Sequence, residues 1–244
     1  MSDVTMTFNG LSSTATKLGI LQILDIERNI LPGTEEYTKK IEGMDGVYDL
    51  GFDRPPLVIP VSFLVGGDTL EQVRTYAREI ASWLEQRKVK ELTFSDEPDI
   101  RYLARITGAV PQKQIIHTGE CKVNFFVPSS YAESKVIRTV TGVFQNEGTA
   151  DAPCVISGQV NANISELRFN NQATGEYILI DKGLTAGDVF SIDTAKHLVL
   201  INGVDSREFV TYNSDYFVLP EGQNEVTVAQ ANVTFDVSFR ERWK

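Results

Sequence analysis

The chain has 244 residues, of which 42% are hydrophobic and 23% are charged, and this balance excludes a chain that stays disordered for lack of apolar side chains. The formal net charge is −10, which argues against sequence-independent DNA binding, because neutralising phosphates requires a clustered positive face. The length is sufficient for two ordinary domains, each with a core of its own.

The first part of the chain has the pattern of β-strands separated by turns. Runs rich in Val, Ile, Leu and Phe predict strands at 18–26, 47–52 and 57–65. Asp45-Gly46 precedes the second run and is typical of a turn between strands. Pro60 lies inside the third run. We expect an edge or a bulge there, because proline lacks the N–H that a β-ladder uses.

One segment has the spacing of an amphipathic α-helix. Asp68 is expected to cap its N-terminus, and Glu71 completes a pattern that resembles a capping box. Apolar residues recur at helical spacing from Leu70 to Leu84, so one face of the helix should pack on a sheet. We expect the helix to end near Arg87, because cations suit a helix C-terminus.

Beyond the helix the pattern returns to strands. We expect strands at 92–94, 102–107 and 122–128, with an acidic turn at 96–99 between the first two. Residues 129–134 have the polar composition of a linker. The predicted domains are therefore 1–134 and 135–244.

The second part carries no helical pattern from Thr139 onward. Short β-prone runs recur instead, at 155–160, 165–169, 177–180, 189–193, 197–201, 217–219, 225–228 and 233–239. Such spacing predicts a β-sandwich or a jelly roll. Asn202-Gly203 suits a tight hairpin turn. The predicted fold class is thus mainly β: an N-terminal sandwich-like domain with one packed helix, and a C-terminal β-sandwich.

No group of residues has the spacing of a catalytic or metal site. His117 and His197 lie in different predicted domains without a second ligand nearby, and the acidic residues 96–99 are interpreted as a solvated turn. There is no Gly-x-Ser-x-Gly motif, and Gly66-Gly67 is not followed by Gly-Lys-Ser/Thr. Cys121 and Cys154 are expected to stay unpaired. We therefore predict no enzyme activity, no cofactor and no metal.

Sugar binding is the alternative function that the residues leave open, because β-sandwiches often stack sugars on exposed aromatic rings. Tyr212 and Tyr216 are the first candidates for such a contact. A hydrolase would need a convergent acid and base, and the sequence offers no such pair.

Read together, the order and spacing of many short motifs resemble one family over nearly the whole chain. In the first part the motifs are Phe8-Asn9-Gly10, Glu42-Gly43-Met44-Asp45-Gly46, the strand at 57–65, Trp83-Leu84, Leu92-x-Phe94, Asp96-Glu97-Pro98-Asp99 and Tyr102-x-Ala104-Arg105. In the second they are Pro153 with Ile156, the segment 170–175, Gly187-Asp188, Asp193, Ile201-Asn202-Gly203 and Phe217-x-Leu219-x-x-Gly222-x-Asn224. The set resembles the distal tail protein (Dit) family of siphophages and prophages of Gram-positive bacteria.

The resemblance implies a virion structural protein at the distal end of the tail, made in the host cytoplasm and without membrane attachment. It implies a homo-hexameric ring, the tail-tip (baseplate) hub, whose N-terminal domains join the tail tube to tip proteins such as a tail-associated lysin or a receptor-binding protein. It also implies that the C-terminal domain is a galectin-like β-sandwich, and that phage DNA passes through the lumen without specific binding.

Overall fold

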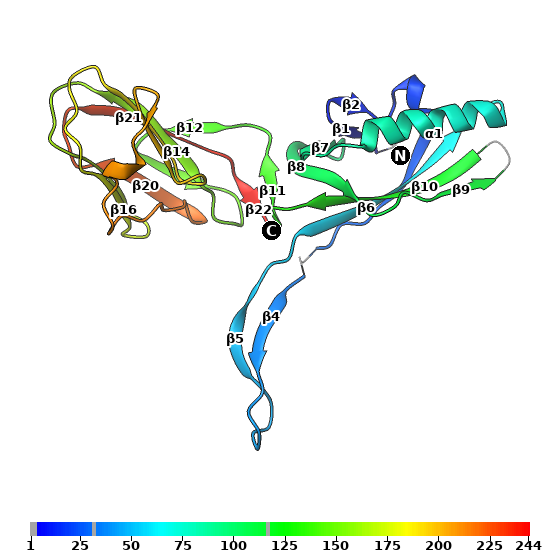
Figure 1. Cartoon of the computed structure of the whole chain (residues 1–244), viewed down its shortest axis with the longest axis horizontal. Helices are drawn as coiled ribbons and strands as arrows, with labels where there is room; N and C mark the ends of the chain where they lie inside the picture. Colours follow the sequence, from blue (N-terminus) through cyan, green and yellow to red (C-terminus); the bar gives the residue numbers. More distant parts are fainter. Residues whose placement is uncertain (1–3, 31–32, 116–117) are drawn as a thin grey trace. The chain divides into compact units, whose positions relative to one another are not determined.

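β-Strands dominate the chain, as the computed structural model in Figure 1 shows for residues 4–30, 33–115 and 118–244. Among these residues α1 (Leu70–Leu84) is the one α-helix, so the predicted mainly β fold with a single helix is confirmed. The chain divides into two units, residues 1–132 with Lys244, and residues 133–243. Each unit has its own cluster of buried apolar side chains.

The first unit is built on an antiparallel sheet with the strand order β2-β1-β7-β8-β10-β6-β3, and β9 pairs with β10. Its strands are β1 Met6–Phe8, β2 Leu11–Ser12, β3 Ile20–Ile26, β6 Leu57–Gly66, β7 Lys90–Phe94, β8 Glu97–Thr107, β9 Gln112–Ile115 and β10 Thr118–Val127. A short 3-10 helix, Thr16–Leu18, precedes β3. The strand predicted from residue 18 therefore begins two residues later, at Ile20.

One face of this sheet is apolar because alternate residues of β6 and β10 point to it. Val61, Phe63, Val123 and Phe125 are all fully buried. Helix α1 covers this face (Figure 1) with a stripe of four buried residues, Val73, Ile80, Trp83 and Leu84. The Trp83 indole also donates a hydrogen bond of 2.9 Å to the Phe8 carbonyl. The expected packing of the helix on a sheet is thus confirmed.

Pro60 lies in an interior strand, and neither an edge nor a bulge accommodates it. β6 pairs with β10 on one side and with β3 on the other, but the β3 ladder ends at the pair Ile26↔Val61. The N–H and C=O of one strand residue point to the same neighbour. At Pro60 this neighbour is the chain just beyond the end of the β3 ladder, where no N–H donor is required. The Pro60 carbonyl alone takes part, as the acceptor of a 2.9 Å hydrogen bond from the Glu27 N–H.

The ends of α1 differ from the predicted ones. The N-cap is Thr69, whose hydroxyl accepts from the Gln72 N–H at 3.2 Å, while the Gln72 side chain accepts from the Asp68 N–H at 2.9 Å. The capping interaction is therefore shifted by one residue from the predicted Asp68 and Glu71 pattern. The helix ends at Leu84, before the cations expected at its C-terminus.

Strand β8 is longer than predicted. The turn that follows β7 consists of residues 95–96, and Glu97 already belongs to β8. Three of the four residues predicted as an acidic turn are therefore in a strand. Pro98 is tolerated because it is the second residue of that strand, where the ladder with β7 begins with the pair Phe94↔Glu97.

The second unit is a sandwich of two antiparallel sheets, with strand orders β12-β21-β14-β17-β18-β19 and β13-β20-β15-β16. Its strands are β12 Arg138–Val140, β13 Val143–Asn146, β14 Cys154–Val160, β15 Leu167–Asn171, β16 Tyr177–Ile180, β17 Val189–Asp193, β18 Leu198–Ile201, β19 Val204–Asp205, β20 Gly222–Val228 and β21 Val233–Phe239. The shorter β11 (Ala132–Ser134) and β22 (Arg242–Trp243) pair with each other. The predicted C-terminal β-sandwich is confirmed.

In this unit one predicted turn is confirmed and one predicted strand is not. Asn202 and Gly203 have φ angles of 52° and 79° and join β18 to β19, as the predicted tight turn requires. Residues 217–219 do not form a strand. Leu219 makes only an isolated bridge to Ala152, although Phe217 and Leu219 are buried in the core of this unit.

Candidate functional site

A hairpin of β4 (Glu35–Lys39) and β5 (Tyr48–Asp53) stands apart from the sheet of the first unit. Its two strands pair with each other in a sheet of their own, and every residue in them is exposed (Figure 1). We call residues 35–53 the arm. The strand predicted at 47–52 corresponds to β5, whereas β4 was not predicted, and no sequence pattern indicated that both strands are exposed on both faces.

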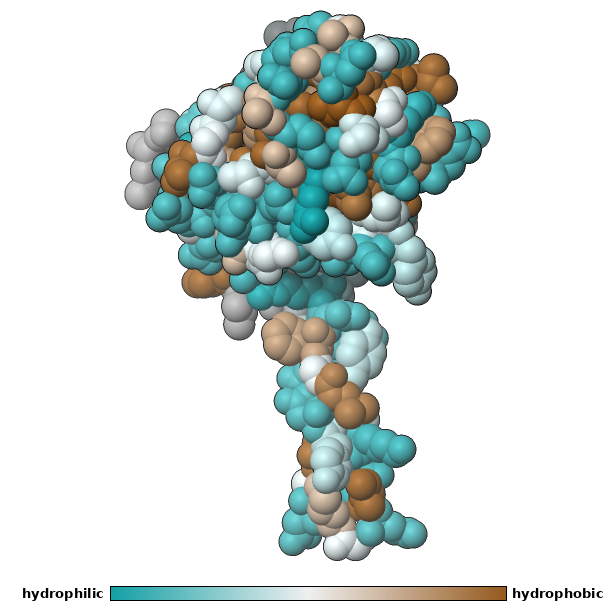
Figure 2. All heavy atoms as spheres, turned by 90° about the vertical axis from the view of Figure 1, so that its left-hand side faces the viewer, coloured by the Kyte–Doolittle hydropathy of each residue, from teal (hydrophilic) through white to brown (hydrophobic). Residues whose placement is uncertain are grey.

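The arm carries large apolar side chains that proteins usually bury (Figure 2). These exposed residues are Tyr37, Ile41, Met44, Val47, Tyr48, Leu50 and Phe52. Large apolar side chains gathered in exposed positions on one segment are typical of interaction sites, and a single two-stranded hairpin is marginally stable in water. The arm therefore has the properties of a segment that another chain covers.

The arm is irregular at one defined point. Its register shifts between Glu36 and Thr38, opposite Gly51, whose φ of 97° suits glycine. The Asp49 carboxylate accepts from the Gly51 N–H at 2.9 Å. Such a bulge increases the twist of a hairpin and interrupts the flat edge that invites indiscriminate strand pairing. The bulge thus disfavours indiscriminate pairing of the arm's strand edges.

The root of the arm is fixed to its own unit by a serine in the segment predicted as a linker. Ser130 has a positive φ of 52°, and its hydroxyl lies 2.7 Å from the Pro55 carbonyl oxygen and 3.2 Å from that of Arg54. The arm thus leaves the first unit from a defined point.

A second surface feature of the first unit is an apolar hollow beside α1, with a volume of about 370 Å³. Ile80 and Leu84 of the helix and Cys121 of β10 line it, together with Val110 from the loop after β8. Burial raises the pKa of the Cys121 thiol to about 11, so this thiol is protonated and unreactive at neutral pH. The hollow offers apolar contact and no nucleophile.

The acidic turn after β7 is neutralised by an arginine and does not hold an open carboxylate cluster. Arg28 forms a bidentate pair with Asp96 at 2.8 and 2.9 Å and lies 3.3 Å from Glu97. Its guanidinium also stacks 4.5 Å from the centre of the Phe94 ring. The hydrogen bond from Arg28 holds the pKa of Asp96 below its ordinary value. These groups fasten the chain beyond β3 to the β7–β8 turn.

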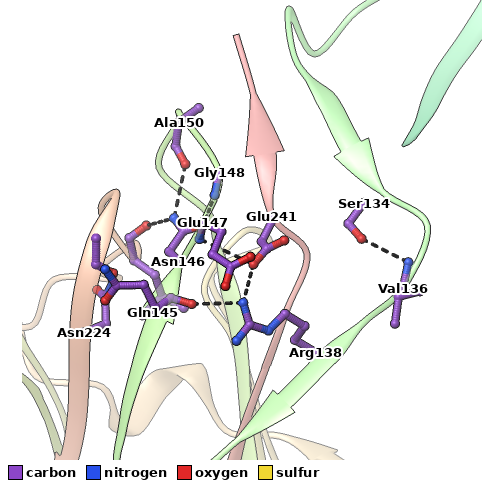
Figure 3. A network of polar contacts seen from close by, with 12 residues as sticks. Ser134, Val136, Arg138, Gln145, Asn146, Glu147, Gly148, Ala150, Asn224 and Glu241 are labelled. Atoms are coloured by element: carbon purple, nitrogen blue, oxygen red, sulfur yellow. Dashed lines mark hydrogen bonds and ion pairs between the residues drawn. The ribbon is translucent and has the colours of Figure 1, made fainter. Parts of the chain in front are cut away.

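In the second unit a polar network joins the segment before β12 to the end of the chain (Figure 3). Arg138 donates to the Gln145 carbonyl at 3.0 Å and pairs with the carboxylate of Glu241, which is buried. Arg242 pairs with Glu133 at 3.0 Å. The buried Asn146 amide donates to main-chain carbonyls of neighbouring turns. Each of these side chains has a partner within the chain, so the contacts are structural.

The two tyrosines predicted as sugar contacts have different environments. The Tyr212 side chain is fully exposed. One face of the Tyr216 ring stacks on His197, with a centroid distance of 4.6 Å and an interplanar angle of 8°, and Tyr216 packs against the core of its unit. Sugar contact at these residues stays a prediction.

Among the described residues, no three His, Cys, Asp or Glu side chains are grouped as metal ligands, and His117 lies outside the described residues. Cys121 and Cys154 are both free and buried, as expected. In this part of the chain, no helix combines the length and apolar character that a membrane span requires.

Two family matches, one within each unit, follow the division of the chain. The family described as "Phage tail protein RIFT-related domain" matches residues 13–127, and "Siphovirus-type tail component, C-terminal domain" matches residues 147–243. The chain belongs to the distal tail protein (Dit) family of siphophages. The resemblance found in the sequence is therefore confirmed.

Solved Dit and baseplate structures have a similar fold. The crystal structure of the phage SPP1 Dit protein, described as a paradigm of hub adsorption apparatus in phages that infect Gram-positive bacteria, has 19% identity, covers 99% of both chains and gives a TM-score of 0.85. A chain of the phage P2 baseplate in its activated conformation has 9% identity and a TM-score of 0.51, over 99% of this chain and 97% of that one. Curated protein sequences gave no match.

As a Dit-family chain, the protein is a structural component of the phage tail tip and of the virion. The family consists of structural tail proteins, which supports the predicted structural role at the level of the family. The arm and the hollow are two exposed apolar features of the first unit, and the sequence analysis predicted neither of them as such.

Proposed function

We propose that six copies of this Dit-family chain form a ring at the distal end of the tail, which joins the tail tube to the tip or receptor-binding proteins. The observation that carries the proposal is the arm, whose strands are exposed at every position and carry Tyr48, Leu50 and Phe52. A hairpin of this kind gains stability when a neighbour covers it.

Ring closure follows from the kind of contact that an arm makes. An arm that reaches a different surface on the next copy makes a head-to-tail contact, and repeated contacts of that kind close into a ring when the rotation permits. The similarity in fold to a Dit protein described as part of a hub supports this assembly.

The proposal assigns a different role to each of the two predicted domains. Residues 1–134 form the ring, because they contain the arm, and residues 135–244 form the galectin-like sandwich at its outside. The net charge of −10 favours a lumen that repels phosphates, so that DNA passes without specific binding.

The mass of the purified chain, measured by light scattering, and negative-stain images test the ring. We expect six times the mass of one chain and ring-shaped particles. Replacing Leu50 and Phe52 by Ser should leave single chains, because the arm then loses its apolar contacts. Val204→Ser in the second unit is the matched control, since Val204 and Leu50 are both 65% exposed. Absence of the chain from purified phage particles would overturn the proposal.

Attachment to a cell-wall polysaccharide is a second candidate function, favoured by the fully exposed Tyr212 ring on a β-sandwich. Tyr216 would contribute its free edge, because His197 covers one ring face. Glycan-array binding that is lost in Tyr212→Ala, but kept in Tyr48→Ala on the arm, would support it. Equal binding by both variants would contradict it.

A further inference from the structure

We infer that the arm of one copy docks into the apolar hollow beside α1 of the next copy. The inference rests on the ring proposed above and names the surface that receives the arm. A second copy of this chain is thus the occupant of the hollow.

The hollow is open on its own chain and lined for apolar contact. Ile80 and Leu84 are 3% exposed and Cys121 is 4% exposed, so they form a floor. Ala77 and Ala81 leave space at the helix wall, and Val110, at 39% exposed, stands at the margin. Small side chains on the helix are the reason that a cavity remains between α1 and the sheet.

The hollow is large enough for side chains of the arm. An apolar cavity of about 150 Å³ in another protein takes up a benzene molecule, and the volume here is about 370 Å³. Leu50 and Phe52 occupy alternate positions of β5 and are 65% and 55% exposed. One of these side chains can enter the hollow while its neighbours cover the rim.

Charge also matches the two surfaces. Residues 35–53 contain six acidic and two basic residues, a net charge of −4. Residues 70–89, which comprise α1 and the loop after it, contain four basic and three acidic residues, a net charge of +1. Glu85 is the one charged side chain among the described residues that line the hollow, and the exposed Arg87 and Lys88 follow it at the rim. Opposite charge at the rim orients an apolar contact and speeds its formation.

The arm does not fill the hollow of its own chain, because every residue of β4 and β5 is exposed. One chain therefore carries both an unfilled apolar cavity and an uncovered apolar arm of opposite charge. Such a pair of complementary surfaces on one molecule makes a heterologous contact, and the same contact repeats from copy to copy.

Cross-linking between two differently labelled chains tests the contact. Chains with Leu50→Cys are mixed with chains that carry Val110→Cys, both in a Cys121→Ala background, and are oxidised. We expect a disulfide-linked pair made of one chain of each kind. Val189→Cys in the second unit, at 53% exposed, is the control partner and should give no such pair. Equal yields with both partners would overturn the inference.

Filling the hollow gives an independent readout. Ala81 is exposed, so Ala81→Trp can fold and block the hollow, while Ser82→Trp on the same exposed turn is the control. We expect Ala81→Trp to raise the midpoint concentration of ring assembly by about tenfold or more, and Ser82→Trp to leave it unchanged. Rings that persist in Ala81→Trp without a cross-link would refute the docking site and leave the ring standing. Absence of rings in the unmodified chain would count against both proposals.

Discussion

Arg28 shows how one side chain fastens distant parts of the first unit. It lies between Asp96 and the ring of Phe94, and 68 positions separate the two charged partners in the sequence. No pattern of neighbouring residues predicts such a pair, because both partners are common surface residues. The burial of Cys121, in contrast, was predictable, since a small side chain at an inward position of an alternating strand is buried wherever the sheet is covered.

The pair of Arg28 and Asp96 should make stability depend on pH. The folded-state pKa of Asp96 is lowered, so its contribution is present above the unfolded pKa of about 3.9 and is lost as pH falls through the folded value. In Asp96→Asn we expect the urea midpoint to fall less than in the unmodified chain between about pH 5 and pH 2. Asp99→Asn, outside the pair, should keep the original dependence. Identical pH profiles for the Asp96→Asn and unmodified chains would contradict the prediction.

At the scale of elements, burial decides which strands a sequence pattern can predict. β6 and β10 alternate because one face is covered, and their apolar runs were found. β4 is exposed at all five positions, so its sequence lacks the alternation of apolar and polar residues that a buried face requires. The same reason explains why the exposed start of β8 was interpreted as a turn. In the arm, the strand predicted at 47–52 corresponds to β5 (Tyr48–Asp53), whereas β4 and the exposure of both strands were not predicted.

The helix cap gives a prediction that separates the observed capping from the expected one. Thr69→Ala removes the hydroxyl that accepts from the Gln72 N–H, and we expect a loss of about 1 kcal/mol in the free energy of unfolding of the first unit. Asp68→Ala should cost less, since Asp68 contributes its main-chain N–H to the cap. Urea titrations followed by Trp83 fluorescence measure both, and a larger loss in Asp68→Ala would contradict the assignment.

At the scale of the whole molecule, two separate cores predict two separable unfolding transitions. Trp83 lies in the first unit and Trp243 in the second, so in a Trp243→Phe background fluorescence reports on the first unit. Phe169→Ala should destabilise the second unit by about 3–5 kcal/mol and leave the Trp83 transition unchanged. Phe63→Ala, fully buried in the first unit, is the control that should shift it. A shift of equal size in both variants would show that the units unfold together.

The division into two units and the membership of the Dit family were within reach of the sequence, because many weak motifs in a fixed order carry that information. The proposed assembly surfaces, the arm and the hollow, could not be predicted from the sequence. Whether Leu50 or Phe52 is covered depends on contacts between segments that no local pattern records, and a hollow between α1 and β10 exists only after the helix has packed.

The acidic composition of the arm has a consequence for how free subunits meet. Two arms that approach each other bring like charges together, four net negative charges on each between residues 35 and 53, so they repel before their apolar side chains touch. Electrostatic attraction is possible only between the arm and a surface of positive charge. The apolar side chains of the arm can therefore stay exposed in a free subunit, because electrostatic repulsion disfavours association between two arms. Association with a surface of different charge is not disfavoured in this way.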